Sequence, residues 1–263
     1  MKYIFINKKL IFSLVKKEFI IKYLGSRLGF LWSILNPIFL LVFYTFVFAY
    51  IFQIKWSSAY IIESKTHFAM MLYIGLITFN FFNEILLKSP NIIISNANYV
   101  KKIKIPSEIF CIVACLSSLI SFFISFAVLL LFLLVFQYNF HYEIIYVIII
   151  LIPLFLFCYG LTLLVSSLSV FLKDIQHFLN FTPPLFLFSA PIFYSIDSVP
   201  SKYQFLLYFN PLTLVINDLR DVIFLGNAPN FFYLSIFTSI SIIFIYGSHI
   251  IFSKLQRFFP DVV

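Results

Sequence analysis

An uncharged, apolar run from Leu31 to Ile54 limits the fold of this chain more than any other feature. The run follows a lysine-rich segment and exceeds the about 20 apolar residues that a helix needs to cross a bilayer. The whole chain is 62% hydrophobic and only 11% charged, with a mean hydropathy of +1.05. Ordinary soluble domains have about 45–50% apolar and about 25% charged residues. Because backbone groups inside a bilayer must bond within their own segment, the chain is predicted to be an all-α polytopic membrane protein.

Six apolar segments are predicted as membrane spans, and they make residues 1–263 a single transmembrane domain. We expect the spans near 31–54, 68–87, 108–136, 144–172, 176–196 and 231–252, with residues 1–30 before them and a tail at 253–263. All but four of the 18 lysines and arginines then fall on the side of the two termini; the four are Lys55, Lys65, Lys202 and Arg220. By the positive-inside rule, both termini are predicted to be cytoplasmic.

Residues 1–30 are predicted to form an interfacial helix followed by a cytoplasmic turn. They lack the form of a signal peptide, because the apolar stretch Leu10–Val15 is short and Lys16 and Lys17 interrupt the pattern directly after it. A lysine-bearing helix that lies in the cytoplasmic interface of the membrane is the better interpretation. The net charge of +8 then reflects this asymmetry and the attraction of anionic headgroups.

Between the fifth and sixth predicted spans lie two apolar stretches that are too short to cross a bilayer. Tyr203–Phe209 is followed by Asn210-Pro211 and then by Leu212–Leu225, which contains three charged residues. A seventh span here would also place Lys254 and Arg257 on the wrong side of the membrane. We therefore predict an external re-entrant helical hairpin that is buried in protein.

The chain shows no catalytic or metal-binding pattern and is predicted not to be an enzyme. No G-x-x-x-x-G-K-S/T phosphate loop occurs, so we do not expect the chain to hydrolyse ATP by itself. Cys111, Cys115 and Cys158 lack His or carboxylate neighbours at ligand spacing, so we expect no metal and no cofactor in this chain. Glu84 is the only acid deep in a predicted span, which favours a functional role. Lys88, four residues later, instead favours a local ion pair, and we prefer that interpretation.

The largest predicted cytoplasmic connection, at 88–105, has two open interpretations. It carries Lys101, Lys102 and Lys104 near its end. These lysines fit either a solvated loop attracted to anionic lipids or a docking surface for a cytoplasmic partner. A nucleic-acid partner is not expected, because no basic face on a folded soluble domain is visible.

Aromatic residues make up 21% of the chain, with 38 phenylalanines, 16 tyrosines and 2 tryptophans. One interpretation is a conduit whose rings stack against sugar faces, and the other is codon bias toward phenylalanine combined with lipid contact. Because the enrichment is not confined to one helix face, we expect most of it to reflect bias and lipid contact. The candidates for a smaller lining set are Tyr44, Tyr50, Phe186, Phe193 and Tyr194.

Three groups of residues, in order along nearly the whole chain, carry a family resemblance. The first is a glycine-rich turn before the first span, with Tyr23, Gly25, Ser26, Arg27, Leu28, Gly29, Trp32 and Asn36-Pro37. The second is Phe171-Leu-Lys-Asp-Ile175, with Lys173 in place of the usual arginine, and the third is Pro191-Ile-Phe-Tyr194, Pro200 and Asn210-Pro211. Together they resemble the membrane subunits of ABC-2-type polysaccharide exporters for O-antigen, capsule or teichoic acid. The opening signature looks most like the O-antigen exporters.

The resemblance implies a transport subunit of the bacterial inner membrane. Two copies of this chain would pair with two copies of a cytoplasmic ATPase, which would bind ATP and Mg. A conduit between the two permease chains would carry a glycan linked to undecaprenyl pyrophosphate. The resemblance also implies residue roles: a substrate entrance at Tyr23, Gly25, Arg27 and Gly29, an external gate at Pro191, Asn210 and Pro211, and ATPase coupling at Lys101, Lys102, Lys104, Lys173 and Asp174.

Arg27 and the substrate each leave an alternative. A guanidinium between two glycines suits phosphate oxygens, whereas the simpler interpretation of Arg27 is an anchor in lipid headgroups. ABC-2 exporters of small amphiphiles or drugs share the six-helix plan. A membrane-embedded acyl- or glycosyltransferase would need acids or histidines that face one side of the membrane, and the sequence offers no such grouping.

Overall fold

The computed structural model describes residues 8–47, 65–102, 106–138 and 141–262, and in these ranges the regular elements are helices. The longer helices are α2 (Lys8–Ile21), α3 (Trp32–Tyr44), α4 (Lys65–Lys88), α7 (Glu108–Val135), α8 (Tyr146–Ser169) and α13 (Phe231–Leu255). The shorter ones are α5 (Ile92–Ser95), α6 (Ala97–Lys102), α9 (Asp174–Asn180), α10 (Thr182–Ser189), α11 (Ser201–Leu207), α12 (Pro211–Arg220) and α14 (Phe259–Val262).

Five helical stretches of the described chain are long and apolar enough to cross a membrane. They are Gly29–Val47, Thr66–Ser95, Glu108–Val135, Tyr142–Ser169 and Phe231–Phe258, and they fall on the first four predicted spans and on the sixth. The chain is therefore an integral membrane protein of the all-α class. The predicted span 31–54 is described only as far as residue 47.

The fifth predicted span, at 176–196, is not one helix. It is divided into α9 and α10, and the chain from Ala190 to Ser195 is not helical. Pro183 and Pro184 lack backbone N–H groups, so they cannot continue the hydrogen-bond ladder of α9 and instead occupy the first turn of α10. The prediction of a single helix was wrong for this reason, and a membrane span at 176–196 stays a prediction.

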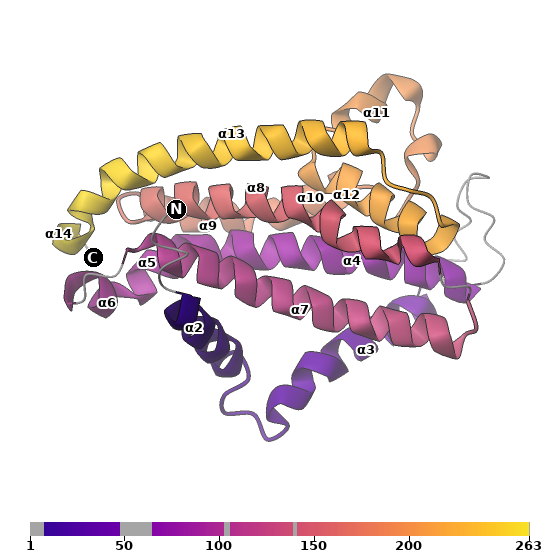
Figure 1. Cartoon of the computed structure of the whole chain (residues 1–263), viewed down its shortest axis with the longest axis horizontal. Coiled ribbons are helices and arrows are strands. Elements are labelled where there is room, and N and C mark those ends of the chain that lie inside the picture. Colours follow the sequence, from indigo (N-terminus) through magenta and orange to yellow (C-terminus); the bar gives the residue numbers. More distant parts are fainter. Residues whose placement is uncertain (1–7, 48–64, 103–105, 139–140, 263) are drawn as a thin grey trace.

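Four long helices, α4, α7, α8 and α13, run side by side along the long axis of the molecule (Figure 1). Helix α13 packs along α8, and α4 packs along α7. Helices α5, α6 and α14 lie at one end of this bundle, and α11 projects near the opposite end. Helices α2 and α3 form a V beside the bundle, and both pack against α7.

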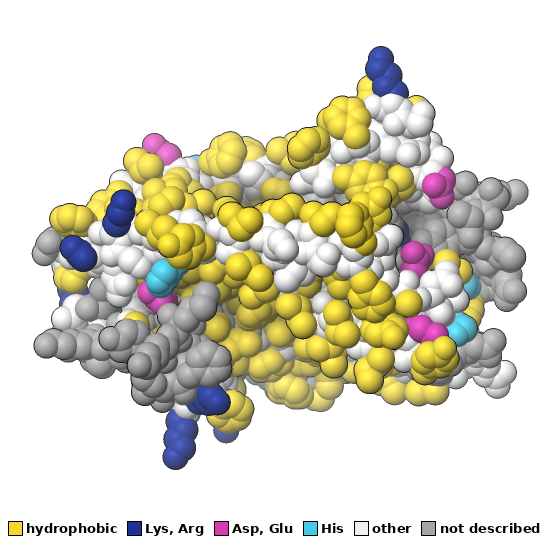
Figure 2. Space-filling model, turned by 45° about the horizontal axis from the view of Figure 1, so that its top comes forward, with side chains coloured by type: hydrophobic (Ala, Val, Ile, Leu, Met, Phe, Trp, Pro, Cys, Tyr) yellow, Lys and Arg dark blue, Asp and Glu magenta, His cyan; other side chains and the backbone are white. Residues whose placement is uncertain are grey.

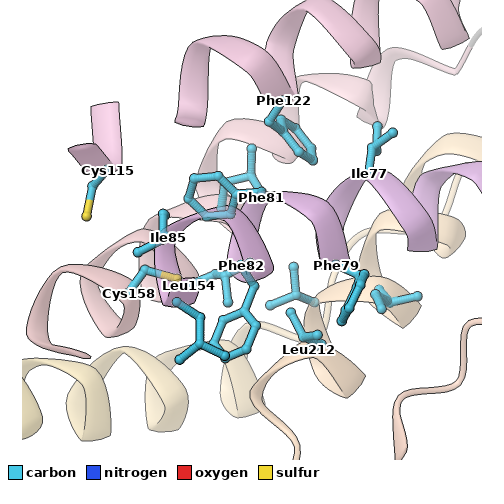
Figure 3. Close-up of a cluster of buried hydrophobic side chains, with 14 of the residues drawn as sticks. Ile77, Phe79, Phe81, Phe82, Ile85, Cys115, Phe122, Leu154, Cys158 and Leu212 are labelled. Atoms are coloured by element: carbon cyan, nitrogen blue, oxygen red, sulfur yellow. The ribbon is translucent and has the colours of Figure 1, made fainter. Parts of the chain in front are cut away.

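Helix α4 is the centre of the hydrophobic core. In its most apolar stretch 78% of residues are buried, compared with 17% for the stretch that contains α3. Figure 3 shows Phe81 and Phe82 of α4 among side chains from three other helices, including Phe122 of α7, Leu154 of α8 and Leu212 of α12. Elements that contact α4 are thus held by the most buried of the five membrane-length stretches of the described chain.

Two short helices follow the divided segment, as predicted, and they meet at Asn210-Pro211. Helix α11 ends at Leu207, and α12 begins at Pro211 after Asn210 accepts a hydrogen bond from the backbone N–H of Leu212 at 2.9 Å. This is a helix N-cap, which satisfies a backbone donor that the helix leaves free. Helix α12 packs against α4 and α8.

Figure 2 shows the charged side chains at the two ends of the visible face, with hydrophobic side chains between them.

Candidate functional site

The predicted entrance turn lies between α2 and α3 and is shaped by two glycines. Gly25 has φ +91° and Gly29 has φ +49°, which are backbone conformations that other residues rarely adopt. The hydroxyl of Ser26 accepts a hydrogen bond from the backbone N–H of Gly29 at 2.9 Å and closes the turn. These conformations fit the turn predicted after the first helix, and its role as an entrance stays a prediction.

Arg27 lies in this turn with an exposed side chain, and it forms no ion pair or hydrogen bond with the described part of the chain. Its planar fork of N–H donors is therefore available to an external anion. Tyr23 begins the same turn, half-buried, with its ring in edge contact with Phe19 at 5.6 Å between centroids. Burial raises the pKa of Tyr23, and the nearby carboxylate of Glu84 raises it further.

A charge network connects α2 with α4 directly beside this turn. Glu84 accepts from Lys88 at 2.8 Å, as the i,i+4 spacing predicted, and also from Lys22 through both carboxylate oxygens at 3.0 Å. Lys88 in turn contacts Glu18 at 3.1 Å. Lys22 has a third partner, the hydroxyl of Ser121 on α7 at 3.1 Å, so all three of its N–H donors are used.

Sequence reasoning missed Lys22 and Glu18 as partners because they lie 62 and 70 residues away from Glu84 and Lys88. A signal was nevertheless present. Glu18 of α2 and Glu84 of α4 are each followed four residues later by a lysine, a spacing that places such a pair on one face of a helix. Two such pairs would have indicated crossed ion pairs between the two segments.

The predicted coupling residues lie on segments that meet at one end of the bundle. Lys101 on α6, Lys173 and Asp174 all have exposed side chains. The short helix Ser89–Asn91 (η3), which opens the 88–102 loop, packs against α9, and α14 packs against α6. The structure thus brings the two predicted coupling loops to the same end. Two predicted coupling residues remain. Lys104 lies outside the described residues, and so does the side chain of Lys102.

The predicted lining residues fall into two groups. Phe186 packs on Phe82 of α4 with ring centroids 4.8 Å apart, and Phe193 lies 5.9 Å from Phe188. Tyr194 donates a hydrogen bond to the carbonyl of Phe188 at 2.9 Å, so these residues gather around α10. Tyr44 lies instead at the end of α3, which packs against α4 and α7. Tyr50 lies outside the described residues.

Asn210 links the end of α10 to the start of α12. Its amide nitrogen donates to the carbonyl of Phe186 at 2.9 Å and to the hydroxyl of Ser189 at 2.8 Å, while its oxygen caps α12. Pro211 occupies the first position of α12, where a missing N–H costs nothing. Two of the three predicted external-gate residues, Asn210 and Pro211, therefore form one connected joint with α10.

Arg220, at the end of α12, has a side chain that is only 1% exposed. It was counted among the external basic residues, within a hairpin predicted to be buried in protein; its burial fits that hairpin, and its side of the membrane stays a prediction. Its guanidinium donates to the carbonyl oxygens of Met71 on α4 at 3.0 Å, of Ile192 at 2.9 Å, and of Pro191. A Cβ atom at Gly75 would lie 3.2 Å from Arg220 Nη2, so this glycine makes room for the buried guanidinium. Backbone carbonyls from three positions thus fix Arg220 in the protein interior.

The buried cysteines pack between α7 and α8. The Sγ atoms of Cys111 and Cys115 lie 3.4 Å and 3.5 Å from the hydroxyls of Ser166 and Thr162, and all three cysteines are free. Across the described ranges, His, Cys, Asp and Glu form no cluster of three or more that could hold a metal ion. The described residues thus offer an exposed arginine in a glycine turn, a network of ion pairs and exposed charged side chains at one end of the bundle. Such groups suit the binding of an anion or of a partner protein.

Comparison with known proteins gives a consistent result over most of the chain. The family described as ABC-2 type transporter matches residues 9–224. An O-antigen export system permease protein RfbA of Klebsiella pneumoniae is 26% identical over 251 residues, which cover 95% of this chain and 93% of that protein. A permease of the same name from Myxococcus xanthus is 20% identical over 256 residues, which cover 97% of this chain and 95% of that protein.

Proposed function

The chain belongs to the ABC-2 type transporter family, and we propose that it exports an O-antigen polysaccharide on a lipid carrier across the bacterial inner membrane, driven by a separate ATPase. The observation that carries this proposal is the similarity to O-antigen export permeases over nearly the full length of both chains. Membrane subunits of ABC-2 transporters are transport components without their own ATPase. ATP and Mg therefore belong to the partner subunit.

The proposed assembly contains two copies of this chain and two ATPase subunits. The helical stretch Gly29–Val47, which contains α3, supports the pairing of two copies, because the side chains of Phe39, Val42, Phe43 and Phe46 in it are all more than half exposed. In the proposed topology both termini are cytoplasmic, α9 and α10 together form the fifth span, and α11 and α12 form the external re-entrant hairpin. The basic residues at the end of the bundle that carries α5, α6 and α14 support this orientation.

The proposed entrance for the lipid-linked pyrophosphate is the turn from Tyr23 to Gly29. Lys22 is fully occupied by Glu84 and Ser121, so Arg27 is the cation of this turn that is available to a phosphate. From there the glycan would pass the aromatic side chains around α10 and leave beside the Asn210 joint. The ATPase would bind at the end surface that carries Lys101, with Lys173 and Asp174 exposed at the start of α9.

One experiment tests the assignment as a whole. The chain would be expressed with and without its cognate ATPase in a strain that makes the lipid-linked glycan but lacks its own permease. Cell-surface glycan should appear only when both subunits are present, and ATP turnover should be absent from the purified chain alone. Export of small amphiphiles without any surface glycan would instead assign the chain to the small-molecule exporters of the family. ATP turnover by the purified chain would contradict the proposal.

Arg27 provides a residue-level prediction of the entrance. Charge-assisted hydrogen bonds contribute about 1.5–3 kcal/mol, so Arg27→Ala should reduce export about tenfold when entry limits the rate. Arg27→Lys should restore only part of it, because an ammonium keeps the charge but loses the bidentate fork. Surface glycan would be measured relative to permease abundance, with Lys16→Ala on α2 as a matched loss of one exposed charge. Full activity of Arg27→Lys would mean that the arginine is only a headgroup anchor.

A further inference from the structure

A cavity of about 550 Å³ lies between α2, α7 and the short helices of the 88–102 loop. Leu14 and Ile21 of α2 and Val113 of α7 give it apolar walls, and Lys17, Asn91 and Tyr99 add polar groups. Its size lies within the range of about 300–1,000 Å³ typical of ligand sites. An apolar wall with a few polar groups suits an amphiphile rather than a free ion. We call this cavity the interfacial pocket.

The charges around the interfacial pocket leave one cation without a carboxylate. Glu18 and Glu84 together neutralise Lys22 and Lys88 through contacts of 2.8–3.1 Å. Lys17 also lines the pocket, but its ammonium contacts only Tyr99, at 3.3 Å from the hydroxyl and 5.5 Å from the ring centroid. Within the described chain Lys17 has no acidic partner, so the pocket carries a surplus positive charge.

Tyr99 holds this charge in place without neutralising it. One of the three N–H donors of Lys17 is used by the tyrosine hydroxyl, which leaves two for a ligand. The amide of Asn91 forms no side-chain hydrogen bond with another described residue, so it adds a further free donor to the wall. Cation and amide donors on one side of an apolar cavity are the groups that recognise a phosphate ester with a hydrocarbon chain.

We propose that the interfacial pocket binds one anionic phospholipid of the surrounding membrane, with its headgroup phosphate at Lys17 and an acyl chain along Leu14, Ile21 and Val113. A membrane phospholipid is the expected ligand because the pocket lies beside the lysines of α2. Helix α2 carries Lys8, Lys9, Lys16 and Lys17 at the basic end of the bundle, where an anionic leaflet surface concentrates such lipids. A lipid bound here would join α2 to the loop that leads into α6. This site is separate from the turn at Arg27 and does not rest on the identity of the glycan.

Binding would be measured on the purified, delipidated full-length chain in detergent by native mass spectrometry with added phosphatidylglycerol. One phosphatidylglycerol per chain should bind tightly, and Lys17→Ala should weaken its binding about tenfold. Lys16→Ala is the matched control, because it removes the same charge from the adjacent position, which does not line this pocket, and it should change binding less than twofold. Tyr99→Phe, which keeps the pocket charge but loses the hydroxyl at Lys17, should weaken binding by a smaller factor.

Thermal unfolding provides a second readout that also reports folding. Phosphatidylglycerol should raise the unfolding temperature of the wild-type chain and of Lys16→Ala but not that of Lys17→Ala. Equal losses of binding in Lys16→Ala and Lys17→Ala would reduce the effect to general surface charge and overturn the proposal. Equal binding of phosphatidylcholine would remove the role of the anion. Saturation by inorganic phosphate, or displacement of the lipid by a short polyprenyl phosphate at stoichiometric amounts, would assign the site to a different phosphate and equally overturn it.

Discussion

The contact between Lys22 and Glu84 makes a quantitative prediction about how α2 is held. Lys22 Nζ lies 3.0 Å from both carboxylate oxygens of Glu84, and the side chains are 34% and 21% exposed. Exposed ion pairs contribute about 0.2–1 kcal/mol, whereas hydrogen bonds to charged groups contribute about 1.5–3 kcal/mol. A half-buried, bidentate pair should fall between these ranges, so we expect a coupling energy of about 1–2 kcal/mol between the two residues.

Glu84→Gln should cost more than the pair alone, because it leaves Lys22 and Lys88 near each other without their shared carboxylate. We expect about 2–3 kcal/mol, which corresponds to a decrease of roughly 5–10 °C in the unfolding temperature of a chain of this size. Lys22→Gln should cost about 1–2 kcal/mol. The double variant should be little worse than Glu84→Gln alone, because the interaction can be lost only once.

The native cysteines provide the assay. Cys111, Cys115 and Cys158 are all at most 1% exposed, so a thiol-reactive fluorophore should label them only as the bundle opens. The labelling midpoint would be measured for the two single variants, the double variant and Lys16→Gln, which removes an exposed charge from the same helix. Additive effects of Lys22→Gln and Glu84→Gln, to within about 0.5 kcal/mol, would refute the coupling.

Three further predictions concern the packing around Arg220, the joint at Asn210 and the topology. Gly75→Ala should lower stability by about 1–3 kcal/mol, because its Cβ would lie 3.2 Å from the Arg220 guanidinium, whereas Gly247→Ala, with no atom within 4 Å, should be neutral or stabilising in the same thiol assay. Asn210→Ala should cost about 2–3 kcal/mol through the lost cap and two lost hydrogen bonds, and Asn210→Asp, which keeps the cap, should cost less. In a background without native cysteines, an impermeant thiol reagent should label a cysteine at Lys202 in intact cells but one at Lys101 only after lysis; the reverse order would contradict the proposed orientation.

Features that depend on local chemistry were predictable from the sequence. The long apolar runs around α4, α7, α8 and α13 follow from composition, because a bilayer admits helices of that length. The turn between α2 and α3 followed from Gly25 and Gly29, because glycine adopts positive φ values without steric cost. The hinge at Asn210-Pro211 likewise follows from a capping residue and a helix-starting proline.

Features that depend on packing between distant segments were not predictable in the same way. The partners of Arg220 could not be identified from the sequence, because they are backbone carbonyls and a carbonyl is present at every residue. The break in the fifth predicted span had a visible cause in Pro183-Pro184, but hydropathy averaged over a window hides such a local interruption. Phe186 lies within α10, and Phe193 follows it in the non-helical chain that begins at Ala190.

The two glutamate–lysine pairs also explain the register of α2, which packs on α7, relative to α4. Glu18 contacts Lys88 while Lys22 contacts Glu84, so increasing residue numbers on α2 meet decreasing numbers on α4, and the two helices are antiparallel where they touch. A shift of α2 by one helical turn would place Glu18 against Glu84 or Lys22 against Lys88, and each like-charge contact in a half-buried site is unfavourable. The apolar residues of α2 do not discriminate in this way, because Ile11, Val15 and Phe19 repeat at the same four-residue interval. The charges, rather than the hydrophobic face, therefore fix the position of the end of α2 relative to α4, directly before the turn that carries Arg27.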